Sequence, residues 1–116
     1  SIDVRFWGNI PSGDMPAMLN CVDLLLLPSL NEGLGMICAE AVRCGAGVIG
    51  SDVGGIPEVI GNDNVVALGD GFAGRMASKS IAMLQTPTVQ VLPSELDWSS
   101  TAAKELSAIR SVLDSE

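Results

Sequence analysis

A run of four leucines, Leu24 to Leu27, constrains the fold of this chain more than any other feature. No polar residue interrupts the run, which is bounded by Asp23 and Pro28. A strand with one face in water alternates apolar and polar residues, whereas a strand covered by helices on both faces is apolar throughout. The leucines therefore predict a buried strand of a parallel sheet.

The rest of the chain alternates between patterns typical of strands and of helices. Further strands are expected over residues 4–8, 47–51 and 64–68. Helices are expected over residues 14–20, 35–44 and 72–84, and a tight turn over residues 54–58. Strands joined by helices form right-handed crossovers in a parallel sheet. We therefore predict an α/β protein, with a Rossmann-like parallel sheet and helices on both of its faces.

The alternating pattern ends at Thr86-Pro87, where a different segment begins. Residues 89–92 are expected to be a short extended piece, and a last helix is expected from about Asp97. Its apolar residues recur three and four positions apart, as in an amphipathic helix that packs on a neighbour: Trp98, Ala102, Leu106, Ile109 and Leu113. The predicted organisation is a Rossmann-like unit over residues 1–86 and a tail with an amphipathic helix over residues 87–116.

The length of 116 residues suits one domain and is short for an enzyme with two substrates. The sequence begins at Ser1, without an initiator methionine or a recognisable targeting sequence. We therefore expect it to be a piece of a longer protein.

The charge balance limits the expected partners. The chain has 14 acidic and 6 basic residues, which gives a formal net charge of -8. Nucleic acids and anionic membranes are bound by clustered lysine and arginine, so neither is an expected partner. An anionic ligand would have to be held mainly by backbone N–H groups.

The chain has three cysteines, Cys21, Cys38 and Cys44, and no histidine. This set does not have the spacing of a zinc site, and the lack of histidine excludes Ser–His and Cys–His nucleophilic chemistry within these residues. Free cysteines behave as small apolar residues, so we expect buried, reduced thiols and a cytoplasmic location. No metal site is predicted.

The segment from Pro28 to Leu34 has the features of a ligand-binding loop. It is predicted to leave the carboxyl end of the leucine strand, where parallel sheets bind ligands, and to enter a helix whose N-terminal dipole favours phosphate. Gly33 and Gly35 lack Cβ atoms, which lets backbone N–H groups approach a ligand closely. A diphosphate would suit this position.

Two glutamates flank the start of the helix expected over residues 35–44. Glu32 precedes the helix and Glu40 lies within it, eight positions later, so both carboxylates are expected to face one cavity. Glu40 stands among apolar residues and is expected to be a buried carboxylate that ribose hydroxyls could satisfy. Two plainer interpretations stay open: Glu32 as a solvated loop residue, and Glu40 as a partner of Arg43 or of the backbone.

A resemblance to a known family rests on two segments. Residues 28–45 read Pro-Ser-Leu-Asn-Glu-Gly-Leu-Gly-Met-Ile-Cys-Ala-Glu-Ala-Val-Arg-Cys-Gly, and residues 51–59 read Ser-Asp-Val-Gly-Gly-Ile-Pro-Glu-Val. Together they resemble the E-x(7)-E region of the group 1, or family-four, glycosyltransferases. The chain departs from the family at Ala46-Gly47, where Thr-Pro is common, and at Leu34, where an aromatic residue is usual. The resemblance implies part of the C-terminal, donor-binding domain of a GT-B fold.

The resemblance also implies a reaction, the retaining transfer of a hexose from a nucleotide diphosphate sugar to a glycan or lipid-linked acceptor. Glu32 would be the catalytic residue, close to the reacting end of the donor sugar. The residues that would bind the donor are Gly33, Leu34, Gly35, Glu40, Gly54 and Gly55. For Gly54 and Gly55, a purely structural role in the turn is an equal alternative. The donor is a substrate, and neither a cofactor nor a metal is implied.

Family members hold the diphosphate with an arginine and a lysine from loops upstream of these residues, and they bind the acceptor with an N-terminal domain. The chain alone is therefore expected to be inactive, and at most peripheral to the cytoplasmic face of the membrane through segments outside these residues. Two rival functions are a nucleotide-sugar 2-epimerase of the same fold and a non-catalytic binding or interaction module. The spacing of Glu32 and Glu40, with its two glycines, favours the transferase.

Overall fold

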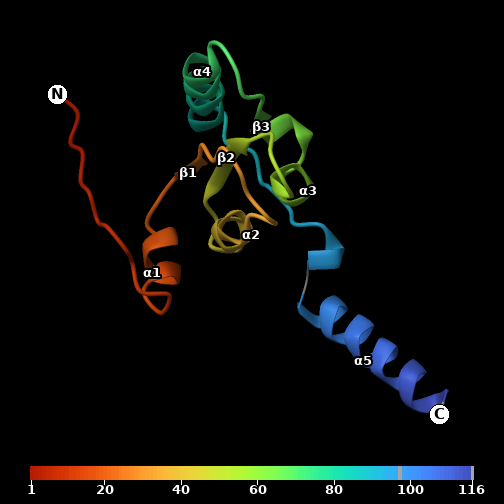
Figure 1. The fold of residues 1–116 in the computed structure, drawn as a ribbon. Helices are drawn as coiled ribbons and strands as arrows, with labels where there is room; N and C mark the ends of the chain where they lie inside the picture. The colour runs from red at the N-terminus through yellow and green to blue at the C-terminus, as the bar shows by residue number, and fades with distance from the viewer. Residues whose placement is uncertain (97, 116) are drawn as a thin grey trace.

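The structure, a computed structural model, describes residues 1–96 and 98–115. Its centre is a three-stranded parallel sheet in the order β1-β2-β3 (Figure 1). The strands are β1 (Leu24–Leu27), β2 (Gly47–Ser51) and β3 (Val65–Val66). In the register, Leu24 of β1 pairs with Gly47 of β2, and Gly50 of β2 pairs with Val65 of β3. The leucine run is therefore a parallel strand, as predicted, but the expected full burial is wrong: β1 is at the edge of the sheet, three of its leucines are partly buried and Leu26 is exposed.

Helices cover both faces of this sheet. One face carries α1 (Met15–Leu19), α2 (Met36–Arg43) and α3 (Ile56–Ile60), and the other carries α4 (Phe72–Gln85). Two short 3-10 helices, η1 (Asn62–Asn64) and η2 (Ser94–Leu96), precede β3 and the last helix, α5 (Trp98–Asp114). Among the helices that the structure describes, none is both long and apolar enough to span a membrane. The predicted α/β fold with a Rossmann-like sheet is confirmed.

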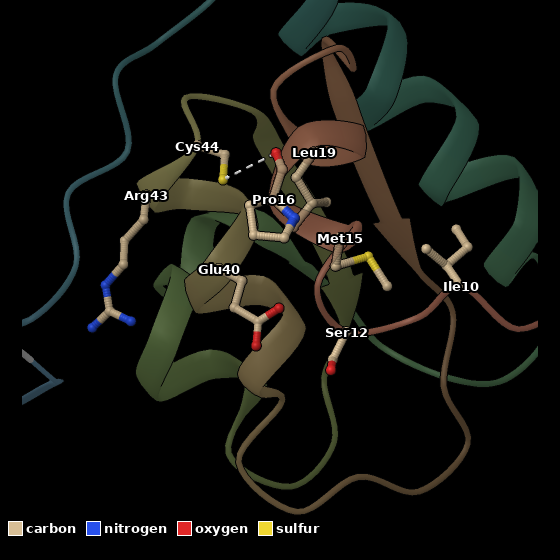
Figure 2. A pocket seen from close by; sticks show the side chains of 8 residues that line it. All are labelled: Ile10, Ser12, Met15, Pro16, Leu19, Glu40, Arg43 and Cys44. Atoms are coloured by element: carbon tan, nitrogen blue, oxygen red, sulfur yellow. Dashed lines mark hydrogen bonds between the residues drawn. The ribbon is translucent and has the colours of Figure 1, made fainter.

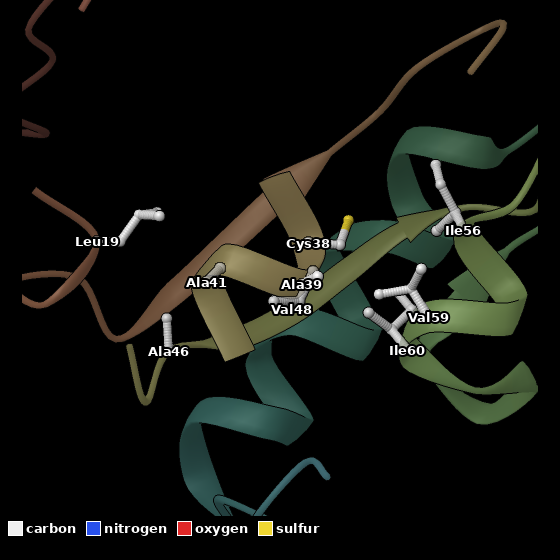
Figure 3. Packing of buried hydrophobic residues seen from close by; sticks show 9 residues of the cluster. All are labelled: Leu19, Cys38, Ala39, Ala41, Ala46, Val48, Ile56, Val59 and Ile60. Atoms are coloured by element: carbon white, nitrogen blue, oxygen red, sulfur yellow. The ribbon is translucent and has the colours of Figure 1, made fainter. Parts of the chain in front are cut away.

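The core is divided between the two faces because successive residues of a strand point to opposite sides. Val48 packs with buried residues of α2 and α3, whereas the next residue, Ile49, packs with Met76 of α4. Both β2 side chains are completely buried. Figure 3 shows the larger cluster, in which the small residues of α2 lie over β2 and the isoleucines of α3 close one end. Small side chains on α2 let the helix lie close to the sheet.

Three predicted elements differ from the structure. Residues 4–8 form no strand, although the structure describes them fully: they lie extended and exposed, away from the sheet (Figure 1). A strand requires a neighbour that pairs its backbone groups, and an apolar pattern alone does not supply one. The third strand is shorter than residues 64–68, and the turn expected over residues 54–58 runs into the helix α3.

The piece expected to be extended over residues 89–92 forms no strand. One of its side chains, that of Gln90, nevertheless hydrogen-bonds to the backbone of β2 as a neighbouring strand would. Gln90 Oε1 accepts a hydrogen bond from Val48 N–H at 2.7 Å, and Gln90 Nε2 donates to Val48 C=O at 2.9 Å. Because β3 pairs with β2 only at Gly50 and Ser51, the amide of Gln90 satisfies the backbone of β2 beyond the end of β3. The last helix begins at Trp98, and the expected start at Asp97 lies outside the described residues.

Candidate functional site

Two loops meet at the carboxyl edge of the sheet. Residues 28–35 leave the end of β1 and enter α2, and residues 52–55 leave the end of β2 and enter α3. Since β1 and β2 are parallel neighbours, both loops emerge on the same side. This edge is where open parallel sheets bind their ligands.

Glu32 lies in the first of these loops and is half-buried. Its carboxylate oxygen Oε1 accepts a hydrogen bond from Ser29 Oγ at 3.3 Å. The carboxylate is thus held by its own loop and is not a freely solvated side chain. Its place at the edge of the sheet suits contact with a ligand there.

The three residues after Glu32 form the approach to α2. Gly33 and Leu34 are exposed, whereas Gly35 is buried and caps the helix in a left-handed conformation, with φ of 72°. Only glycine adopts this conformation without strain. The backbone thereby turns sharply into α2, whose first N–H groups carry the positive end of the helix dipole.

Glu40 occupies a different position from the one expected. The prediction of a buried carboxylate is wrong, because Glu40 is exposed on the face of α2 opposite the buried Cys38, Ala39 and Ala41. It borders an open cavity of about 400 Å³ between α1 and α2 (Figure 2). The cavity is lined by Ile10, Ser12, Met15, Pro16, Leu19, Glu40, Arg43 and Cys44.

Glu32 does not line this cavity, so the cavity that Glu40 borders is not shared by the two glutamates. The structure also does not pair Glu40 with Arg43. The guanidinium of Arg43 points away from Glu40 in Figure 2, and its Nη2 donates to the carbonyl oxygen of Leu96 at 2.5 Å. The Glu40 carboxylate therefore borders the cavity without a salt bridge to Arg43, although both residues line it.

Gly54 and Gly55 lie against the loop that carries Glu32. The N–H of Gly55 donates to the carbonyl oxygen of Gly33 at 2.6 Å, which joins the two loops directly. Gly54 has a positive φ of 52° and is exposed, while Gly55 is half-buried. Both glycines therefore sit at the candidate site, in contact with Gly33 and Glu32.

The cysteines differ in exposure. Cys38 is buried in α2, and burial, together with the Glu32 carboxylate, raises the pKa of its thiol to about 11. A thiol of this kind is a poor nucleophile near neutral pH, because the thiolate is the reactive species. Cys44 is half-buried and Cys21 is exposed, so the expectation of buried thiols is wrong for Cys21.

Sequence reasoning missed several residues of the site. Ile10, Ser12 and Met15 line the cavity of Glu40 because α1 packs against α2. That contact joins distant parts of the chain, and no local sequence pattern predicts it. Ser29 was also missed, although a serine three positions before a glutamate in a turn is a recognisable hydrogen-bonding signal.

The fold and the site together define a class of protein. A parallel α/β sheet with a glycine-rich loop and a helix start at its carboxyl edge is typical of Rossmann-like proteins that bind nucleotides. Within that class, the family described as "Glycosyl transferases group 1" matches residues 1–101. The chain therefore belongs to the group 1 glycosyltransferases, and the GT-B type of fold is confirmed with the family.

Individual relatives match smaller parts. The chain is 45% identical over 56 residues to the serotype-specific mannosyltransferase WbdA of Escherichia coli, a match of 48% of this chain and 7% of that protein. It is 28% identical over 125 residues to the alpha-maltose-1-phosphate synthase of Mycobacterium tuberculosis, covering 92% of this chain and 32% of the relative. The match to the D-inositol 3-phosphate glycosyltransferase of Salinispora arenicola is 31% over 85 residues, 73% of this chain and 19% of that enzyme. The chain thus spans about a third or less of each relative.

Proposed function

We propose that this chain is the donor-binding part of a retaining glycosyltransferase, which moves a hexose from a nucleotide diphosphate sugar to a glycan or lipid-linked acceptor. The observation that carries the proposal is the family match over residues 1–101, whose E-x(7)-E segment lies at the carboxyl edge of the sheet. The epimerase alternative has no support in the comparisons above.

In this proposal, Glu32 is the catalytic residue. Its carboxylate at the edge of the sheet would stabilise the oxocarbenium-like sugar as the diphosphate departs. The backbone groups of Gly33, Leu34 and Gly35 would contact the sugar hydroxyls and the phosphates, since the start of α2 presents N–H groups and a positive dipole.

Glu40 would bind the ribose of the donor. Its cavity of about 400 Å³ is lined by apolar side chains and by three polar or charged residues, Ser12, Glu40 and Arg43. This composition suits a nucleoside, with the base against the apolar side chains and the ribose hydroxyls donating to the carboxylate. We propose Gly54 and Gly55 as further donor-site residues through their contact with the Glu32 loop.

The rest of the enzyme would come from outside these residues. Three basic side chains, those of Arg43, Arg75 and Lys79, donate to backbone carbonyl groups of the chain itself. We therefore propose that an N-terminal domain supplies the acceptor site and the cations that bind the diphosphate. Within this chain, we propose that residues 1–86 form the nucleotide-sugar-binding unit and residues 87–116 a tail. Any contact with the cytoplasmic face of a membrane would also be made by that other part.

The test is a product assay of the full-length protein. It would be incubated with a panel of nucleotide diphosphate sugars, beginning with mannosyl donors because WbdA is named a mannosyltransferase. The expected result is transfer with retention at the anomeric carbon, read by NMR. Inversion, or binding of the sugars without transfer, would overturn the proposal, and the second outcome would favour the non-catalytic module.

Two variants separate the proposed roles. Glu32→Gln keeps the shape of the side chain and removes its charge, so kcat is expected to fall about 100-fold or more. Glu40→Gln is expected to raise KM for the donor about 10-fold with a smaller effect on kcat, because its contact is with the ribose and not with the reacting carbon. A Glu32→Gln enzyme with wild-type kcat would contradict the role of Glu32.

A further inference from the structure

The turn at Gly54 and Gly55 packs directly against the backbone of residues 32–34. A Cβ atom placed on Gly54 would overlap the carbonyl oxygen of Glu32 and would lie 2.7 Å from that of Gly33. A Cβ on Gly55 would lie 2.9 Å from Leu34 Cα. Contacts this close to a backbone are open only to residues without a side chain. The two loops are therefore packed backbone against backbone.

The side chain of Glu32 also has a hydrogen-bond partner within its own loop. Ser29 and Glu32 are both half-buried, and the Ser29 hydroxyl donates to Glu32 Oε1 at 3.3 Å. The bond limits rotation of the carboxylate. A carboxylate accepts several hydrogen bonds, so a substrate hydroxyl can still bind its other oxygen.

We infer that Ser29 and Gly54 are positioning residues for Glu32. Gly54 fixes the backbone at Glu32, Ser29 fixes the carboxylate, and the catalytic geometry is set before the donor binds. The inference rests on the role proposed for Glu32 in transfer. Displacing a catalytic group by about 1 Å can cost on the order of 100-fold in rate, so such support has a kinetic consequence.

The position of the support predicts which kinetic constant changes. Glu40 lies in the cavity between α1 and α2, and neither Ser29 nor Gly54 lines that cavity. Binding of the nucleoside part of the donor, which is assigned to this cavity, should therefore persist when the support of Glu32 is removed. The loss should appear in kcat, because Glu32 is assigned to the reacting end of the sugar.

The first test is Gly54→Ala in the full-length protein. The added methyl group displaces the Glu32 backbone, so kcat is expected to fall about 10-fold or more. The affinities for the nucleosides guanosine and uridine, which have no diphosphate to contact residues 33–35, should stay within about twofold of wild type when measured by calorimetry. Gly8→Ala is the matched control: Gly8 also has a positive φ, 64°, but its Cβ would meet no atom within 4 Å. This control should retain wild-type kcat.

Ser29→Ala and Ser29→Thr provide a second test that does not depend on a crowded backbone. Removal of the hydroxyl is expected to lower kcat about 3- to 10-fold with KM for the donor unchanged, and threonine, which keeps a hydroxyl, is expected to restore most of the rate. A purely structural role would not give this rescue. If alanine retains wild-type kcat, or if threonine fails to restore it, the role of Ser29 is overturned.

Glu32→Gln in the same assay separates the positioning inference from the proposed function. If this variant loses activity while Gly54→Ala and Ser29→Ala keep it, the positioning inference fails and the proposed function stands. If Glu32→Gln is fully active, or if the wild-type protein transfers no sugar, both fail.

Discussion

Burial determines the chemistry of individual residues in α2. Cys38 and Glu40 are two positions apart in the same helix, yet Cys38 is fully buried and Glu40 is exposed beside a cavity. The apolar environment raises the pKa of the Cys38 thiol to about 11, and the Glu32 carboxylate adds to the effect by disfavouring a second negative charge. The thiol is therefore a packing residue.

We predict that Cys38 resists alkylation in the folded chain. With a pKa of about 11, roughly one thiol in a thousand is ionised at pH 8. Below pH 11, the ionised fraction increases about tenfold with each unit by which the pH is raised. The exposed Cys21 is an internal control and should be labelled first. The measurement is iodoacetamide labelling at pH 8, followed by mass spectrometry of the peptides with and without urea. Equal labelling of both cysteines without urea would contradict this prediction.

At the scale of secondary-structure elements, β2 depends on a side chain that is distant in the sequence. The N–H and C=O groups of Val48 are both hydrogen-bonded to the amide of Gln90. Val48 itself is completely buried, so water cannot replace this partner without a rearrangement. The segment after α4 is thereby attached to the central strand.

We predict that Gln90→Ala lowers the free energy of unfolding by about 1–3 kcal/mol, because it leaves a buried donor and a buried acceptor without partners. Gln85→Ala is the matched control, since Gln85 is exposed near the end of α4 and the change should have an effect within about 0.5 kcal/mol. Urea unfolding measures both values, and the hydrogen exchange of the Val48 amide should accelerate only in Gln90→Ala. Equal stability of the two variants would show that the bond to β2 contributes little.

At the scale of the whole molecule, α5 extends away from the sheet (Figure 1). The radius of gyration is 17.0 Å, whereas a compact domain of this length is expected to have about 13 Å. The principal contacts of α5 are with η2, its neighbour in the chain, and several of its apolar residues are exposed: Leu106, Ile109, Val112 and Leu113. In the part of the predicted stripe whose side chains the structure describes, Ala102, Leu106, Ile109 and Leu113 are exposed, so the sheet does not cover them.

We predict that a chain ending at Leu96 keeps the fold of the sheet. The change in melting temperature should be within a few degrees, because every α5 side chain whose burial the structure describes is exposed. The radius of gyration measured by small-angle X-ray scattering should fall toward about 13 Å. Loss of cooperative unfolding in the shortened chain would mean that α5 contributes to the core.

Much of the fold could be predicted from short stretches of sequence. The strand at Leu24–Leu27, the strand at Gly47–Ser51 and the helix from Phe72 were all predicted, with ends that agree to within a residue or two. Glu32 was also placed correctly on a loop at the carboxyl edge of the sheet. These features depend on consecutive residues, whose periodicity and turn chemistry can be read directly.

The sequence by itself determined the alternation of strands and helices, the fold class and the family segment with its two glutamates. Only the tertiary structure decided that Glu40 faces an open cavity beside α1, that residues 4–8 lie unpaired, and that Gly54 is packed against the backbone of Glu32. The physical reason is the range of the interactions. Periodicity and turns are local, whereas burial, strand pairing and contact between loops depend on residues that meet only when the chain has folded.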